Sequence, residues 1–150
     1  MESYKWIEFE IEDGVGKITL NRPDVLNSFN KKMGKEAQDA LAICTEDSNI
    51  RAVYITGAGK AFCAGQDLEE AIDPNNAIAD IVRGTYNPII RAIRSIEKPV
   101  VCAVNGVAAG AGANITFACD ITFAGERASF IQSFGNIGLT LNKELSLSLI

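Results

Sequence analysis

The 150-residue sequence contains no histidine. This absence removes the commonest general base of enzymes and the Ser-His and Cys-His nucleophile pairs. The four cysteines have no Cys-x-x-Cys spacing, so the residues do not predict a metal site. Three of the four lie in apolar surroundings, where small buried thiols are the expected alternative. The four cysteines are Cys44, Cys63, Cys102 and Cys119.

The sequence also lacks an excess of positive charge and any long apolar run. A net charge of −5 makes nucleic acid an unexpected partner. No apolar stretch is long enough to cross a bilayer, and the first residues have no apolar signal-peptide core. We therefore expect a cytoplasmic protein without a membrane partner. The length and the 47% hydrophobic content favour a single globular domain over residues 1–150.

Strand-like and helix-like segments alternate along the chain. A β-hairpin is predicted over 4–11 and 15–20, and Asn30 is a plausible N-cap for a helix that ends near Asp47. A second helix over 78–96 contains Pro88, which predicts a kink or a break into two helices. The other predicted elements are strands over 51–56, 100–104 and 128–131, a helix that ends near 118, and a buried strand over 121–124. This order favours an α/β fold with crossover connections.

Two segments rich in small residues each follow a buried strand and lead toward a helix. They are the loops 59–68 and 104–114. Small residues let a ligand approach the backbone, and N–H groups in the first turn of a helix have no intrahelical acceptor. Two such N–H groups directed at one point form an oxyanion hole, in which one donor contributes about 3–4 kcal/mol to a transition state. Each loop alone is equally compatible with a tight turn and close helix packing, and neither fits a phosphate-binding or dinucleotide-binding glycine motif.

The residues of these two loops resemble the signatures of a known family. The segment Lys60-Ala-Phe-Cys-Ala-Gly-Gln-Asp-Leu68 resembles the first signature of the crotonase (enoyl-CoA hydratase/isomerase) superfamily, and Val104-Asn-Gly-Val-Ala-Ala-Gly-Ala-Gly-Ala113 resembles the second. The segment Asn21-Arg-Pro-Asp-Val-Leu-Asn27 resembles the loop that cups CoA in that family. In its Cys-Ala-Gly-Gln-Asp-Leu form, the first signature is similar to the epoxyphenylacetyl-CoA isomerases of phenylacetate catabolism. The resemblance implies a crotonase-like (ClpP/crotonase) fold with a ββα spiral core.

The resemblance also implies roles for individual residues. The backbone N–H groups of Gln66 and Ala111 would hold the thioester oxygen of an acyl-CoA. No cofactor is implied, because coenzyme A is part of the substrate, and the family forms trimers or hexamers. Asp67 has an alternative role as the N-cap of the following helix. The residues expected to contact the substrate are Val25, Ala64, Gly65, Asp67, Leu68 and Gly110.

The sequence departs from the family where the catalytic carboxylates are expected. By resemblance, the two glutamates of the hydratases fall at Asn114 and Phe134, and the aspartate of the isomerases falls at Asn142. An amide or a phenyl ring cannot act as the base, and the nearby Glu144 is also readily explained as a surface charge. The resemblance ends near residue 139, so we expect an incomplete domain without the C-terminal helical region. A frameshift in the gene is one hypothesis for this ending.

Three functional interpretations remain open at this stage. The chain is an enoyl-CoA hydratase or isomerase, or an inactive relative that retains only the fold or CoA binding, or a structural domain. If the domain is incomplete, residues 121–138 should expose apolar surface, and the chain should self-associate.

Overall fold

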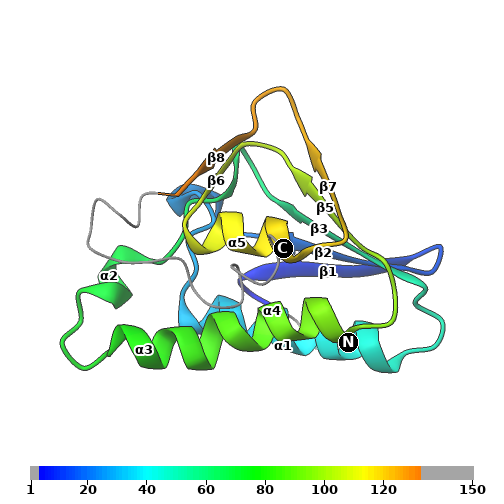
Figure 1. Ribbon diagram of the computed structural model, residues 1–150, viewed down its shortest axis with the longest axis horizontal. Coiled ribbons are helices and arrows are strands. Elements are labelled where there is room, and N and C mark those ends of the chain that lie inside the picture. Colours follow the sequence, from blue (N-terminus) through cyan, green and yellow to red (C-terminus); the bar gives the residue numbers. More distant parts are fainter. Residues whose placement is uncertain (1–3, 133–150) are drawn as a thin grey trace.

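The strands of the protein form two sheets in the computed structural model, which describes residues 4–132 (Figure 1). The larger sheet has the order β1-β2-β3-β5-β7, and the smaller has the order β4-β6-β8. Of the strands in the described part of the chain, β1 and β2 pair antiparallel and the other pairs are parallel. The strands are β1 (Ile7–Glu12), β2 (Val15–Leu20), β3 (Ala52–Gly57), β4 (Ala61–Cys63), β5 (Val100–Val104), β6 (Val107–Ala109), β7 (Ile121–Ala124) and β8 (Ser129–Ile131).

The predicted hairpin and the first helix are confirmed. Helix α1 (Lys31–Glu46) begins after Asn30, whose side chain accepts a hydrogen bond from the Met33 N–H, and Asp47 caps its C-terminus. This N-cap satisfies one of the N–H groups that a helix start leaves free. The remaining helices are η1 (Pro23–Val25), α2 (Leu68–Ala71), α3 (Ile78–Ile81), η2 (Val82–Tyr86), α4 (Asn87–Ser95) and α5 (Ala111–Ala118).

The second predicted helix is divided into three successive segments. Helix α3 passes into the π-helical segment η2, and α4 then begins with Pro88 in its first turn. The π-helical turn just before Pro88 changes the hydrogen-bond register at the point where the proline has no N–H to donate. The chain is therefore not broken into two helices at Pro88: it stays helical from 78 to 95, and the irregularity before the proline is a π-helical turn.

The core lies between the larger sheet and the helices that run along it. Helix α1 contacts both α4 and β2, while α5 lies between α4 and the smaller sheet (Figure 1). All four cysteines are buried and form no disulfide, whereas burial was predicted for three of them. Burial raises the pKa of the Cys44 thiol to about 11, which keeps this group neutral at ordinary pH.

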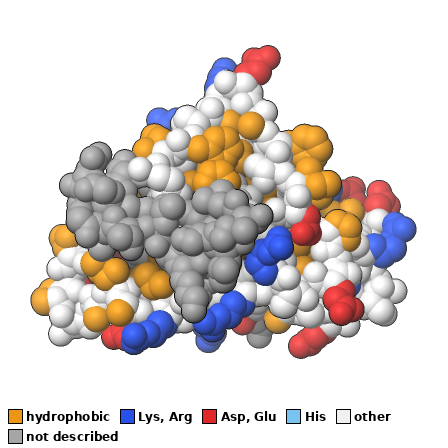
Figure 2. All heavy atoms as spheres, viewed as in Figure 1, with side chains coloured by type: hydrophobic (Ala, Val, Ile, Leu, Met, Phe, Trp, Pro, Cys, Tyr) orange, Lys and Arg blue, Asp and Glu red, His pale blue; other side chains and the backbone are white. Residues whose placement is uncertain are grey.

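The prediction of a buried strand over 121–124 is wrong. Among the described residues, strand β7 pairs only with β5, and its residues Ile121 and Phe123 are 50% and 63% exposed. Apolar residues favour burial of a strand, but they do not show that another helix or strand packs against it. Phe130 and Ile131 of β8 are exposed as well, so the expected apolar surface is confirmed for the described part of 121–138. Figure 2 shows apolar side chains gathered on the part of the surface where these strands lie.

No helix within residues 4–132 is both long and apolar enough to cross a membrane.

Candidate active site

Each of the two small-residue loops contains a short strand, and the two strands pair with each other. Strand β4 lies in the first loop and β6 in the second, with Ala61 opposite Val107 and Cys63 opposite Ala108. The prediction that these segments are loops throughout is wrong at β4 and β6. Strands of three residues are too short to show an alternating pattern. The pairing brings the ends of both loops to one edge of the smaller sheet.

Glycines allow the backbones of the two loops to approach closely. A Cβ atom on Gly65 would lie 3.0 Å from the carbonyl oxygen of Ala109, and Gly65 has a φ of +103° that favours glycine. A Cβ on Gly112 would collide with Cys63. The two loops are therefore packed closely at two points, Gly65 against Ala109 and Gly112 against Cys63. The tight packing predicted for each loop is thus present at the place where the ligand site is predicted.

The backbone of Gln66 is held by a bridge to Phe29. The Phe29 N–H donates to Gly65 O at 2.7 Å, and the Asp67 N–H donates to Phe29 O at 2.8 Å. Successive residues of an extended chain direct their N–H groups to opposite sides. The N–H of Gln66, which lies between these two bonded residues, therefore points away from Phe29.

The backbone N–H of Ala111 lies at the start of helix α5. The Gly110 N–H donates to Ile131 O at 2.9 Å in the smaller sheet, and Gly110 then turns the chain with φ 53° and ψ −122°. Ala111 is the first residue of α5, where an N–H has no acceptor within the helix. The partial positive charge of a helix N-terminus also favours a negatively charged oxygen. Of the two predicted oxyanion-hole residues, Gln66 thus follows β4 and Ala111 follows β6, and these two strands pair with each other.

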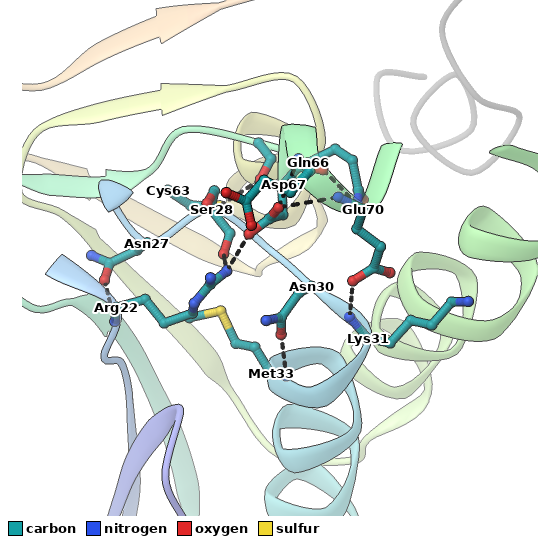
Figure 3. A network of polar contacts seen from close by, with 12 residues as sticks. Arg22, Asn27, Ser28, Asn30, Lys31, Met33, Cys63, Gln66, Asp67 and Glu70 are labelled. Atoms are coloured by element: carbon teal, nitrogen blue, oxygen red, sulfur yellow. Dashed lines mark hydrogen bonds and ion pairs between the residues drawn. The ribbon is translucent and has the colours of Figure 1, made fainter. Parts of the chain in front are cut away.

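The predicted N-cap role of Asp67 is confirmed. Its carboxylate accepts hydrogen bonds from the N–H groups of Glu69 and Glu70 at the start of α2. The other carboxylate oxygen pairs with Arg22 at 2.9 Å, and both side chains are nearly buried. Arg22 also donates to Ser28 O at 2.6 Å (Figure 3). The Asp67 side chain therefore ties the first loop to the segment 21–28, while its predicted contact with the substrate remains a prediction.

Two asparagines hold the turn between β3 and β4, and neither was identified as important from the sequence. Asn27 is fully buried, and its amide donates to Ala58 O at 2.8 Å and to Ala61 O at 2.9 Å. Its oxygen accepts a hydrogen bond from the Arg22 N–H. Asn105 also donates to Ala61 O, at 3.1 Å. The sequence offers one hint of their importance, which is that Asn27 ends the segment 21–27 and Asn105 lies near the start of the segment 104–113.

The side chain of Gln66 contacts Tyr86, a residue of η2 that lies far away in the sequence. The Tyr86 hydroxyl donates a hydrogen bond to Gln66 Oε1, and Gln66 Nε2 donates to Asp67 O at 3.3 Å. Burial raises the pKa of the Tyr86 phenol well above its usual range, so the hydroxyl keeps its proton. Figure 3 shows Gln66 beside Asp67 and Glu70, in the network that joins the first loop to α1.

The residues predicted to contact the substrate differ in exposure. Val25, in η1, is 44% exposed, and Leu68, at the start of α2, is 77% exposed. Ala64 and Gly110 are half-buried, and Gly65 is buried. The Ala64 N–H donates to Leu26 O at 2.9 Å, which places the predicted CoA loop beside the first signature.

Asn114 is buried on α5 and takes part in a neutral amide contact. Its Oδ1 accepts a hydrogen bond from Gln132 Nε2 at 2.7 Å. Phe134, Asn142 and Glu144 lie outside the described residues. In the part of the chain that the structure describes, no three His, Cys, Asp or Glu side chains gather closely enough to hold a metal ion.

The sequence matches the model of one protein family, enoyl-CoA hydratase/isomerase, over residues 10–149. Among curated proteins, the 1,2-epoxyphenylacetyl-CoA isomerase of Escherichia coli K12 is 44% identical over 139 residues, which cover 90% of this chain and 53% of that protein. The chain spans about half the length of the curated relatives it matches.

Solved structures give the same result for the fold. An enoyl-CoA hydratase from Mycobacterium avium subsp. paratuberculosis K-10 superposes with a TM-score of 0.81 at 34% identity, over 93% of this chain and 52% of that one. An enoyl-CoA hydratase/carnithine racemase from Magnetospirillum magneticum has a TM-score of 0.88 at 27% identity, over 98% and 56% of the two chains. The predicted crotonase-like α/β fold is thereby confirmed.

Proposed function

Because the chain belongs to the enoyl-CoA hydratase/isomerase family, we propose that it binds an acyl-CoA thioester and holds the thioester oxygen with two backbone N–H groups. The proposed donors are Gln66 and Ala111. The observation that carries this proposal is the packing of the two signature loops through Gly65 and Gly112, which brings both donors to one edge of the smaller sheet.

Such a pair of donors favours loss of a proton from the carbon next to the thioester. As that proton passes to a carboxylate base, for which Glu144 is the candidate, the electrons of the C–H bond move through the α-carbon onto the carbonyl oxygen, which becomes an enolate. The bridge to Phe29 fixes the direction of the Gln66 N–H, and the start of α5 fixes that of Ala111. Donors that are held in place before the reaction need no reorganisation when the charge appears, and each contributes about 3–4 kcal/mol.

The proposed substrate contacts follow the family resemblance. Val25 would lie near the nucleotide of CoA, and Leu68, Ala64, Gly65, Asp67 and Gly110 would line the path of the thioester. The exposure of Val25 and Leu68 supports this assignment, because both side chains are accessible to a ligand. Coenzyme A would enter as part of the substrate, so no separate cofactor is proposed. We also propose a cytoplasmic location and a role in phenylacetate or fatty acid catabolism.

A second candidate function is thioester binding without turnover. It is favoured by Asn114, which occupies the position that the resemblance assigns to a hydratase glutamate. An amide that accepts a hydrogen bond from Gln132 cannot take up a proton near neutral pH. In this alternative the chain keeps the oxyanion hole and lacks the base.

Calorimetric titration with an acyl-CoA and with free CoA tests the proposal. Both should bind, and the acyl-CoA should bind more tightly. Nuclear magnetic resonance in D2O then follows exchange of the protons next to the thioester, alongside assays of hydration and isomerisation. Exchange that is lost in a Glu144→Ala variant would identify a base and favour the enzyme, whereas binding without exchange favours the second candidate. No binding of either ligand would contradict both.

A further inference from the structure

The side chain of Gln66 is fixed by a contact that the proposed chemistry does not explain. Gln66 contributes only its backbone N–H to the proposed oxyanion hole, yet its side-chain oxygen accepts a hydrogen bond from Tyr86. Tyr86 is almost completely buried, and Gln66 is half-buried. A buried hydroxyl that loses its acceptor carries a free-energy cost, so this pair resists separation.

The same tyrosine also packs against the residue that holds the Gln66 backbone. The rings of Tyr86 and Phe29 have centroids 5.8 Å apart with an angle of 54° between their planes. Phe29 makes the two backbone hydrogen bonds on either side of Gln66. Tyr86 therefore contacts both the side chain of Gln66 and Phe29, the residue that fixes the Gln66 backbone.

The segment that carries Tyr86 is itself anchored. Tyr86 is the last residue of the π-helical segment η2, and Gln38 of α1 donates a hydrogen bond to the carbonyl oxygen of Gly84 at 3.0 Å. π-Helical turns are rare and occur frequently at functional sites. Gly65, the residue that precedes Gln66, has no side chain with which to hold its neighbour in place.

From these contacts we propose that Tyr86 is a positioning residue, which holds Gln66 so that its backbone N–H stays directed at the thioester oxygen. This inference rests on the proposed function and adds a residue to its site. Tyr86 acts through Gln66 and does not touch the substrate in this account. Removal of the hydroxyl should therefore weaken the hydrogen bond to the thioester without affecting the contacts to the CoA portion.

Infrared difference spectroscopy of a bound acyl-CoA labelled with ¹³C at its carbonyl measures that hydrogen bond directly. In the unaltered chain, the carbonyl band of the bound thioester should lie at lower frequency than in water. In Tyr86→Phe, this displacement should be smaller and the affinity for the acyl-CoA about fivefold weaker, the effect of losing one modest hydrogen bond. The affinity for free CoA should not change. Tyr54→Phe removes a hydroxyl from a half-buried tyrosine on β3 and should change none of these values.

The outcomes separate this inference from the proposed function. An unchanged carbonyl band in Tyr86→Phe, with the acyl-CoA still bound, would overturn the positioning role and leave the oxyanion hole intact. A band that is not displaced in the unaltered chain would overturn the oxyanion hole, and the positioning role with it. If Tyr86→Phe does not fold, as judged by circular dichroism, Gln66→Met removes the same hydrogen bond from the other side. The same smaller displacement is then expected, and its absence would again contradict the inference.

Discussion

Gly112 meets Cys63 so closely that a Cβ atom on the glycine would collide with the carbonyl oxygen and the Cβ of the cysteine. This contact joins the start of α5 to the end of β4. Of the proposed donors, Ala111 immediately precedes Gly112, and Gln66 follows Cys63 by three residues. The distance between the two signature loops is therefore set by the absence of a side chain at position 112.

A Gly112→Ala substitution should separate the loops. The added methyl group can be accommodated only if the backbones shift, which costs about 1–3 kcal/mol of unfolding free energy, and the affinity for acyl-CoA should fall. The matched control is Gly84→Ala, because a Cβ on Gly84 has no neighbour within 4 Å. That control should be neutral or stabilising by up to about 1 kcal/mol. Urea denaturation and calorimetry measure both quantities, and equal effects of the two substitutions would refute this account of the contact.

Substitution of Asp67 should separate its two structural roles. Asp67→Ala loses the N-cap and leaves the nearly buried Arg22 without its ion-pair partner. The free energy of unfolding is expected to fall by about 3–5 kcal/mol. Asp67→Asn keeps a capping side chain and should be less destabilising. Asp80→Asn is the control, since Asp80 and Arg83 form an exposed ion pair at 3.9 Å, and a change within about 0.5 kcal/mol is expected. If Asp67→Ala were as mild as the control, the ion pair would not hold the first loop in place.

The stability of the fold should decrease at alkaline pH, partly because of Cys63. Burial raises the pKa of this thiol from 9.0 to about 12. Between these two values the unfolded chain releases a proton that the folded chain retains. The stabilisation is complete below pH 9 and is lost as the pH rises toward 12. Denaturation from pH 8 to 10.5 should therefore show a shallower decline for Cys63→Ala than for the unaltered chain. Parallel declines would rule out this contribution.

The exposed apolar residues of β7 should promote self-association. Phe123 is 63% exposed on a strand that, within residues 4–132, lies at the edge of the larger sheet, and such an edge is a template for pairing with another chain. Phe123→Lys should reduce association in sedimentation velocity experiments over a range of concentrations. Ile72→Lys is the control, because Ile72 is 79% exposed but lies outside the sheets. If both substitutions reduced association equally, the association would be nonspecific hydrophobic contact, and the role of the strand edge would be contradicted.

The sequence was most informative where a pattern extends over several turns or strands. The N-cap at Asn30 and the regular spacing of apolar residues predicted α1 almost to its last residue. Strands β4 and β6 were missed because three residues cannot display a period. The burial of β7 was predicted wrongly, because Phe123 is apolar whether or not another element covers it.

At the candidate site the sequence predicted the loops but not their supports. The small residues and the family resemblance indicated Gln66 and Ala111 as donors. Tyr86 lies 20 residues from Gln66 on a different element, and no local rule relates the two positions. The two roles of the Asn27 amide also depend on carbonyl groups more than 30 residues away. Contacts of this kind arise from the tertiary fold and are not encoded in any single motif.

The central claim is that two backbone N–H groups hold a thioester oxygen, and one comparison tests it most directly. Calorimetric titration measures the affinity of the chain for an acyl-CoA and for the matched thioether, in which a methylene group replaces the carbonyl. The account predicts that the thioester binds about tenfold more tightly or better, a difference of about 1.4 kcal/mol or more. Equal affinities for the two ligands would contradict it.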